Sequence, residues 1–168
     1  MKFRKKMTPI VIMSLILASL TMTAQLTDGQ LKVHFINVGQ GDCIFVETPN
    51  GKNMLIDAGW DSKGKDIVVP YLKNLGVDSL QYVMISHYHG DHIGGLNEVI
   101  EDFHISRCAL DRGGTYESDW DGSHYDRYIE LMGDNRRELK KGDTIDLDED
   151  VNIRVVAASG NGHVDLDE

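Results

Sequence analysis

The stretch MISHYHGDHIGGL, residues 84–96, carries three of the seven histidines of the chain and one aspartate within six positions. An apolar run that favours a strand precedes these residues, and two glycines follow them. In an extended segment, side chains two residues apart point the same way, so we expect His87 and His89 to project together while Tyr88 faces the opposite side. Two neutral imidazoles directed at one point suit zinc or a similar cation.

Gly90 permits a sharp change of direction, so Asp91 and His92 can be directed at a second point close to the first. One loop could then serve two neighbouring metal ions. A helix through these residues is the weaker alternative, because glycine weakens helix interiors. We therefore expect a loop at the end of a strand, followed by a helix that begins near Gly95. A polar surface loop that merely contains histidines is the competing interpretation, and the density of metal-binding types disfavours it.

The elements around this cluster mix strands and helices. Strands are predicted at 31–38, 43–48, 53–59, 81–86, 105–111, 144–147 and 151–158. Helices are predicted at 65–76 and 94–103, and the segment 124–143 is predicted to be a helix and a loop. Pro70 implies that the first helix either begins there or is kinked. Antiparallel hairpins come first, and the mixture suggests a sheet covered on one side by helices.

These residues resemble a known family. SHYHGDHIGG matches the H-x-H-x-D-H signature of the metallo-β-lactamase fold, and NVGQGD, LIDAG and VVPYLKNLGV resemble the branch that includes the hydrolase domain of the DNA-uptake protein ComEC. The likeness is detailed over residues 31–96 and looser to residue 158. It implies an α/β (α+β) fold, a metallo-β-lactamase-type αββα sandwich represented mainly by its N-terminal half, in a domain that spans residues 25–168.

The resemblance also implies a set of metal ligands. His87 and His89 would ligate one ion, and Asp91 and His92 a second. Asp57 would steady the metal loop from outside the ligand shell. The implied metal is zinc, with two ions in the complete protein, and manganese or iron are alternatives. Two ions about 3.5–4 Å apart lower the pKa of a shared water toward about 7, which gives a hydroxide nucleophile.

The implied function is that of an exported metal-dependent hydrolase of a phosphodiester or an ester- or lactam-like small molecule. Asp91 is the expected catalytic residue, because it would both ligate a metal and orient the nucleophile. His163 follows the last strand and is either a third ligand or, as we favour, an exposed loop histidine. The ligands that family members supply later are otherwise not evident. The alternative is therefore a non-catalytic metal-binding or incomplete domain, from a truncated chain whose apolar faces would be exposed.

The first residues are typical of a secretory signal peptide, predicted to span residues 1–24. A basic stub at residues 2–6 precedes an apolar run at residues 10–20, which is too short to cross a bilayer comfortably. Met22 is bulky for a cleavage site, so a retained anchor is the alternative. The predicted location is periplasmic or extracellular, with no membrane association beyond this segment.

The chain is acidic, with a formal net charge of −10. Removing residues 1–24 takes away four of the 17 basic residues and none of the 27 acidic ones, so the charge becomes −14. Such a surface disfavours long nucleic acids unless a local basic patch or bound metal offsets it. Cys43 and Cys108 lie in apolar runs, where free thiols are at least as plausible as a disulfide. No pattern specifies an oligomeric state.

The remaining histidines and tryptophans carry weaker predictions. His34 and His104 are expected to be structural. His124 follows a glycine-rich loop and is expected to be solvated, with a position lining the cleft as the alternative. Trp60 and Trp120 could flank a substrate, although lone aromatic residues more often serve packing.

Overall fold

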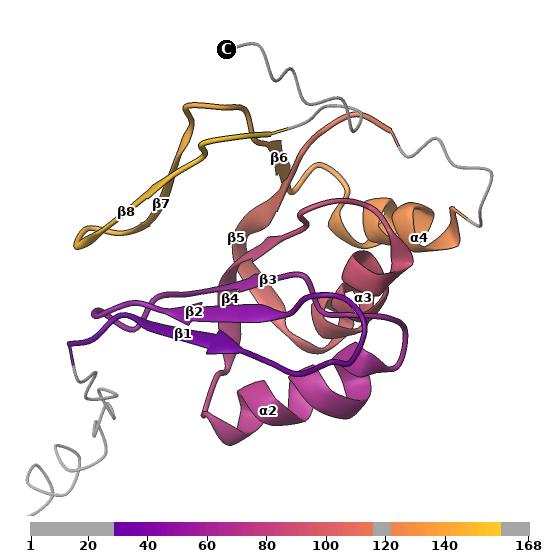
Figure 1. Cartoon of the computed structure of the whole chain (residues 1–168), viewed down its shortest axis with the longest axis horizontal. Helices are drawn as coiled ribbons and strands as arrows, with labels where there is room; N and C mark the ends of the chain where they lie inside the picture. Colours follow the sequence, from indigo (N-terminus) through magenta and orange to yellow (C-terminus); the bar gives the residue numbers. More distant parts are fainter. Residues whose placement is uncertain (1–28, 116–121, 159–168) are drawn as a thin grey trace, which may run out of the picture.

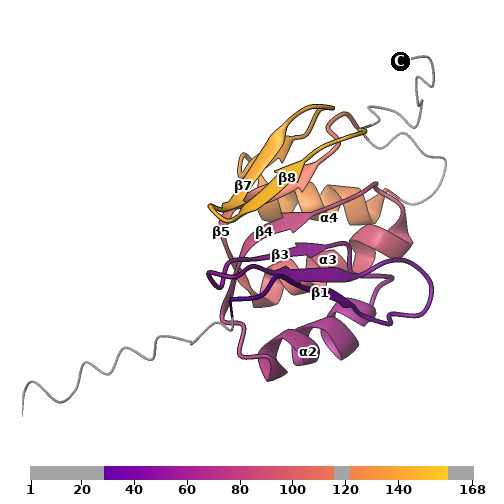
Figure 2. The ribbon, with the colours of Figure 1, turned by 60° about the vertical axis from the view of Figure 1, so that its left-hand side comes forward.

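The computed structural model of the chain describes residues 29–115 and 122–158, which form three packed layers. Within these residues, helices lie on one face of a six-stranded sheet and a two-stranded sheet packs against the other face (Figure 1). Figure 2 shows the same layers from a second direction. The predicted α/β class, a mixed sheet with helices against it, is confirmed.

The central sheet combines an antiparallel meander with parallel strands, in the order β1-β2-β3-β4-β5-β6. The first three strands pair antiparallel, as predicted, and they span Lys32–Phe35 (β1), Ile44–Glu47 (β2) and Asn53–Ile56 (β3). The next three add in parallel and span Ser79–Met84 (β4), His104–Asp111 (β5) and Arg136–Glu138 (β6). Parallel neighbours need long crossover connections, and the helices lie in those connections.

The crossovers place their helices on one face of the sheet. Between β3 and β4 the chain forms a π-helical turn, Gly64–Val68 (η1), and then α2, Val69–Asn74. The helix α3, Gly90–Asp102, joins β4 to β5, and α4, Ser123–Met132, joins β5 to β6. Pro70 is the second residue of α2, and the helical run continues into α2 from η1, because Val68 and Val69 both have αR backbone. Of the two predicted alternatives, neither holds in full, because the α-helical part begins at Val69, next to Pro70, but continues a π-helical turn that begins at Gly64.

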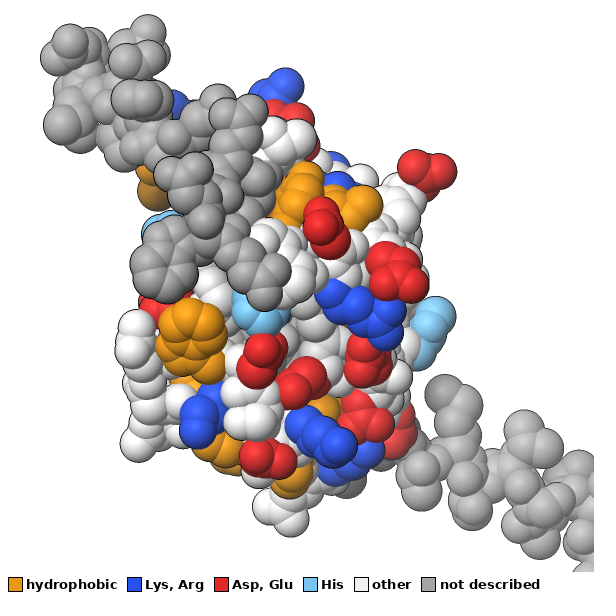
Figure 3. All heavy atoms as spheres, turned by 90° about the vertical axis from the view of Figure 1, so that its right-hand side faces the viewer, with side chains coloured by type: hydrophobic (Ala, Val, Ile, Leu, Met, Phe, Trp, Pro, Cys, Tyr) orange, Lys and Arg blue, Asp and Glu red, His pale blue; other side chains and the backbone are white. Residues whose placement is uncertain are grey.

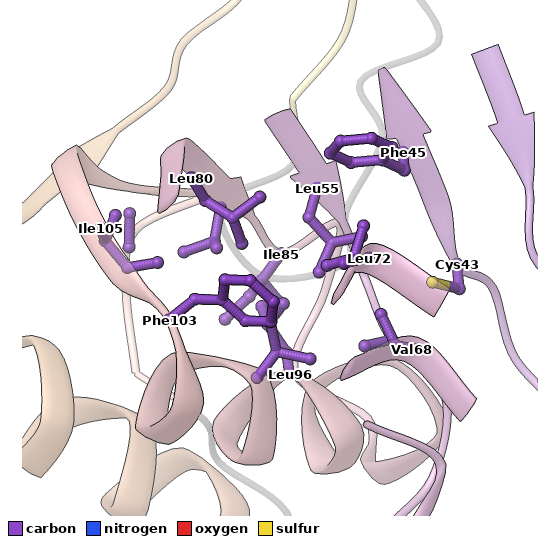
Figure 4. Close-up of a cluster of buried hydrophobic side chains, with 14 of the residues drawn as sticks. Cys43, Phe45, Leu55, Val68, Leu72, Leu80, Ile85, Leu96, Phe103 and Ile105 are labelled. Atoms are coloured by element: carbon purple, nitrogen blue, oxygen red, sulfur yellow. The ribbon is translucent and has the colours of Figure 1, made fainter. Parts of the chain in front are cut away.

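Neighbouring strand residues divide the core between the two faces of the sheet. Leu55 is fully buried on the helix side, in a cluster that includes Leu72 of α2 and Leu96 of α3 (Figure 4). Burying one leucine side chain contributes about 1.5–3 kcal/mol. Met54 points to the other side, where it packs with Tyr82. Both faces of β3 and β4 are thus covered, as the continuous apolar runs in their sequences require.

The second sheet is a hairpin that covers the face of the central sheet away from the helices. It consists of β7, Thr144–Asp148, and β8, Val151–Arg154, which pair antiparallel. Ile145 and Leu147 of β7 are buried against Met54 of β3 and its neighbours. This hairpin is therefore the second sheet layer of the predicted sandwich.

A buried carboxylate fastens the hairpin to the turn between β2 and β3. Asp148 accepts hydrogen bonds from the Thr48 hydroxyl, from Asn50 Nδ2 at 2.7 Å and from the Asp150 backbone N–H at 2.9 Å. These donors favour the ionised carboxylate, and the Thr48 hydroxyl contributes most. Together they lower the pKa of Asp148 from 3.8 to about 2.

Several predictions of element boundaries are wrong. The predicted strands 31–38, 53–59 and 151–158 end earlier, at Phe35, Ile56 and Arg154. The helix α3 begins at Gly90 rather than near Gly95, because Gly94 and Gly95 are accommodated inside the helix where it packs closely on neighbouring backbone. A Cβ atom at Gly95 would lie 2.2 Å from the Ala58 carbonyl oxygen. The strand β6 lies within the segment 124–143, predicted to be helix and loop. Its three polar residues are ordered by pairing with β5 and not by a pattern of their own.

The strand β1 forms one edge of the sheet and presents apolar side chains to solvent. Leu31, Val33 and Phe35 are 52%, 47% and 80% exposed. Of the four layers in an αββα sandwich, the residues 29–115 and 122–158 form three, namely one helix layer and two sheets. The exposed face of β1 belongs to the side of the sheet that the hairpin only partly covers.

The predicted signal peptide, residues 1–24, lies outside the described residues. None of the helices in the described part of the chain combines the length and the apolar composition needed to cross a bilayer.

The hydrogen bonds that Asp148 accepts make the stability of the fold sensitive to acid. Because folding lowers the pKa of Asp148 from 3.8 to about 2, its contribution to the free energy of unfolding is complete above pH 3.8. That contribution is lost as the pH falls through about 2. We expect urea unfolding of the unaltered chain to show this loss and Asp148→Asn to lack it.

Glu149→Gln is the matched control, since Glu149 is the exposed neighbour of Asp148 in the same turn. Its pH profile should follow that of the unaltered chain. If the unfolding free energy of Asp148→Asn varied with pH in the same way as that of the unaltered chain and of Glu149→Gln, the assigned role of Asp148 would be wrong.

Candidate metal centre

The predicted ligands converge at the junction of β4 and α3. The imidazole rings of His87 and His89 lie 4.7 Å apart between centroids, and those of His87 and His92 lie 4.0 Å apart. Tyr88, between the first two histidines, points the other way and is buried, with its hydroxyl donating to the Gly113 carbonyl at 3.2 Å. The predicted alternation of side chains along this segment is confirmed, and three imidazoles share one small volume.

Asp91 and His92 lie in the first turn of α3 and not in a loop. His89 directly precedes the helix with extended backbone, ψ 147°, so the chain turns from strand to helix at this residue. Asp91 Oδ1 lies 3.9 Å from His92 Nε2, which places a carboxylate beside the imidazole cluster. The negative charge of Asp91 is also favourable at a helix N-terminus. The structure thus brings the four predicted residues together, on a strand end and a helix start.

Close backbone contacts fix where α3 begins. The Ala58 N–H donates to the His92 carbonyl at 3.0 Å, and the Gly95 N–H donates to the Gly59 carbonyl at 2.9 Å. A Cβ atom at Gly64 would lie 1.9 Å from the Gly95 carbonyl oxygen, so only glycine allows this approach. The loop after β3 and the helix α3 are therefore held backbone to backbone, and the helix carries its ligands to a defined place.

Asp57 lies behind the imidazole cluster, as the resemblance implied. This aspartate is buried and adopts left-handed backbone geometry, φ 53°. Its Oδ1 accepts from the Ser86 backbone N–H at 2.9 Å, and its Oδ2 accepts from the Ser86 hydroxyl at 2.5 Å and from His92 Nδ1 at 2.9 Å. A buried carboxylate needs such donors to offset the loss of its hydration.

Ser86 extends this network to a second histidine, a role that was not predicted from the sequence. The Ser86 hydroxyl hydrogen is directed at Asp57, so its oxygen is left to accept from His87 Nδ1 at 3.1 Å. His87 and His92 are then both protonated at Nδ1, and each keeps a lone pair on Nε2. Hydrogen bonding that fixes the tautomer in this way is typical of metal-binding histidines.

The pKa values of His87 and His92 are shifted in opposite directions. The pKa of His87 is lowered by burial and then by its neighbours His92 and His89, so His87 is held in the neutral form that binds metal ions. The pKa of His92 is raised, chiefly by its hydrogen bond to Asp57. A cation at Nε2 of His92 would replace the second proton that Asp57 favours. The donor set therefore fits a divalent cation such as zinc.

Two further side chains reach the site from the turn between β1 and β2. Asp42, Asp57 and His92 each offer one ligand atom, and these atoms all lie within 4.8 Å of one another, so they could hold a metal ion. Asp42 Oδ2 is 4.0 Å from His92 Nδ1, the nitrogen already bonded to Asp57. We therefore place the cation on the Nε2 side of His92, toward Asp91. Gln40 Nε2 donates to Asp91 Oδ2 at 3.2 Å.

Neither Gln40 nor Asp42 was predicted as a site residue. Both lie in the NVGQGD motif, residues 37–42, which is one of the motifs that carry the family resemblance. The signal in the sequence that could have indicated Gln40 and Asp42 was this polar motif between two predicted strands.

The other histidines that were named as candidates and that the structure describes are not part of the imidazole cluster. His34 is structural, as predicted, because it bonds to the Tyr71 hydroxyl at 2.8 Å and to Glu47 at 3.0 Å. His104 is exposed on β5, and His124 Nδ1 lies 3.4 Å from an Asp61 carboxylate oxygen. His163 and Trp120 lie outside the described residues.

Trp60 borders the metal centre. It is 42% exposed, and a Cβ atom at Gly90 would lie 2.4 Å from its ring. The indole therefore covers the start of α3, and Gly90 makes room for it. Its position agrees with both predicted interpretations, because one part of the ring packs while another part faces solvent.

The two cysteines are free thiols, in agreement with one of the predicted alternatives. Cys43 is buried, and burial raises the pKa of its thiol to about 12. Cys108 is half-buried, and burial raises its pKa as well. Raised pKa values keep both thiols protonated at neutral pH.

Comparison with known proteins agrees with this geometry. Residues 36–166 match a family model described as the metallo-beta-lactamase superfamily, which accounts for most of the chain. A crystal structure of the metallo-beta-lactamase SMB-1 in a complex with mercaptoacetic acid is similar with a TM-score of 0.52 and 16% sequence identity. The similarity covers 73% of this chain and 48% of that one, and at this identity it concerns the fold alone.

Two curated proteins are similar in sequence. ComE operon protein 3 of Bacillus subtilis (strain 168) is 28% identical over 98 residues, which make up 49% of this chain. The uncharacterized protein YcaI of Escherichia coli (strain K12) is 25% identical over 137 residues, or 72% of this chain. The matched regions span only 13% and 17% of the lengths of those two proteins.

The network behind the imidazoles gives a direct test at Ser86. Ser86→Ala removes the hydroxyl that links His87 to Asp57 and leaves the backbone N–H bond to Asp57 in place. Loss of such an outer-shell partner typically weakens metal binding about 10–100-fold, and we expect this loss of zinc affinity in a chelator competition assay.

Ser106→Ala is the matched control, since the Ser106 hydroxyl on β5 donates to the Leu80 carbonyl of β4 at 3.3 Å. It should bind zinc as the unaltered chain does. Equal zinc affinity of both variants would refute the assigned role of Ser86.

Proposed function

The chain belongs to the metallo-β-lactamase superfamily, and on this premise we propose that it is a metal-dependent hydrolase whose centre is formed by His87, His89, Asp91 and His92. The observation that carries the proposal is the convergence of three imidazoles, with ring centroids 4.0 and 4.7 Å apart, in front of a buried carboxylate. Imidazole and carboxylate together are the donor set of catalytic zinc sites.

The proposed cofactor is zinc, with two ions in the complete centre and manganese or iron as alternatives. When bound, such ions make water a strong nucleophile at neutral pH and stabilise negative charge on the substrate. The protein contributes orientation. Asp57 and Ser86 orient the rings of His87 and His92 and so fix the direction of their Nε2 lone pairs. Ligands that are already oriented can bind a metal ion without rearrangement of their side chains.

Asp91 is the proposed catalytic residue. Its Oδ1 faces His92 Nε2 at 3.9 Å, and its side chain is 20% exposed, so a water at the centre can reach it. A carboxylate in this place can accept a hydrogen bond from the attacking water while it also ligates a metal. Trp60, exposed beside the start of α3, is the proposed apolar contact for the non-reacting part of the substrate.

The proposed substrate is a small phosphodiester. The similarity to ComE operon protein 3 supports membership of the ComEC-like branch, although it spans 13% of that protein. The net charge of −10 argues against long nucleic acids. On the face drawn in Figure 3, basic side chains lie scattered among acidic ones and form no broad patch. We further propose that residues 1–24 direct export, since they have the pattern of a signal peptide.

A non-catalytic metal-binding domain is the second candidate. A catalytic zinc ion usually takes three protein ligands, so four predicted ligands are ample for one ion and few for two. A second observation also favours this candidate. Phe35 on the edge strand β1 is 80% exposed, as expected where a sheet layer is incomplete. Hydrolysis separates the two candidates, because both predict metal binding.

The first experiment combines zinc content with hydrolysis. We expect the purified chain to bind about two zinc equivalents and to hydrolyse bis-p-nitrophenyl phosphate but not nitrocefin. His87→Ala combined with His89→Ala should abolish hydrolysis and remove at least one zinc equivalent, because these imidazoles supply the first pair of ligands.

His104→Ala is the matched control, because His104 is exposed on β5. It should retain both zinc and activity. Zinc binding without hydrolysis of either compound would leave the non-catalytic candidate, and a chain that binds neither zinc, manganese nor iron would refute both.

A further inference from the structure

The turn between β1 and β2 lies directly against the metal centre. Gly41 in this turn has φ +96°, and a Cβ atom on it would lie 1.8 Å from the Asp91 carbonyl oxygen. No side chain fits between the turn and the first turn of α3. The glycine is thus required both by its backbone conformation and by the approach to Asp91.

The turn is held in this place by bonds that do not involve the metal centre. The Gly39 N–H donates to Asn37 Oδ1 at 3.0 Å, which closes the turn on its first side. On the second side, the Gly59 N–H donates to the Asp42 carbonyl at 3.1 Å. The turn is therefore a fixed platform, and the side chain of Gln40 extends from it.

Gln40 contacts one oxygen of the Asp91 carboxylate. Its Nε2 donates to Asp91 Oδ2 at 3.2 Å, and the other oxygen, Oδ1, faces His92 Nε2 at 3.9 Å. We propose that Gln40 is a positioning residue for Asp91, which holds one carboxylate oxygen so that the other is presented to the cation. This inference rests on the proposed function, and it assigns a task to the NVGQGD motif that the hydrolase proposal leaves unexplained.

The chemistry of an amide suits this task. A neutral amide N–H binds a carboxylate without adding a charge that would repel a cation. A carboxylate that must be ordered at the moment of binding loses side-chain entropy, and a donor that already binds it in the metal-free chain removes part of that cost beforehand. Lysine at this position would bring a positive charge to the cation, and a second carboxylate would repel Asp91. Glutamine avoids both penalties.

A double-mutant cycle on zinc affinity tests the proposal. Gln40→Met keeps the length of the side chain and removes the donor, and Asp91→Ala removes the group that Gln40 is proposed to position. We expect Gln40→Met to weaken zinc binding about 10–100-fold in a chelator competition assay, as for other outer-shell partners. In the Asp91→Ala background the same change should have no further effect, since residues that act through one contact are not additive.

The control is Asn74→Ala, which removes an exposed amide side chain at the end of α2. It should bind zinc as the unaltered chain does, and urea unfolding of the metal-free Gln40→Met chain should match that of the unaltered chain. A Gln40→Met chain with normal zinc affinity overturns the inference and leaves the hydrolase proposal standing. An equal loss with and without Asp91 also overturns it. If the unaltered chain binds neither zinc, manganese nor iron, both proposals fail together.

Discussion

One buried carboxylate organises the candidate metal centre. Asp57, at the end of β3, is removed from water and accepts hydrogen bonds from Ser86 after β4 and from His92 in α3. Burying a carboxylate without donors would cost several kcal/mol (about 2–7 for a neutral polar group and more for a charge). The three segments therefore must meet at Asp57, and the imidazoles that they carry are brought together as a consequence.

Backbone packing sets the direction in which the ligands face. The loop after β3 approaches α3 so closely that Gly64 and Gly95 leave no room for a Cβ atom on either chain segment. Glu98, one turn further along the helix, accepts from the backbone N–H groups of Ser62 and Lys65 at 2.9 Å each. The loop is thus bonded to α3 from two sides, and a shift of the helix start would have to break both sets of contacts.

The local pattern around His87 and His89 was predictable from sequence, because strand alternation depends only on neighbouring residues. The antiparallel meander and the helix near Pro70 were predictable for the same reason. The start of α3, the strand β6 and the part of Ser86 in the network were not, since each depends on contacts between segments far apart in the chain. Gln40 is 51 residues from Asp91, and only the fold places the two side chains together.

The central claim is that Asp57 and Ser86 hold His87 and His92 as Nδ1-protonated imidazoles with free Nε2 lone pairs. Nitrogen-15 NMR of the histidine rings measures this directly, on the metal-free chain at a pH well above both the usual imidazole pKa of about 6.5 and the raised pKa of His92, so that both rings are neutral. Both rings should show protonated Nδ1 and unprotonated Nε2, with the signals assigned through single His→Gln variants. A ring protonated at Nε2 in either residue would contradict the account.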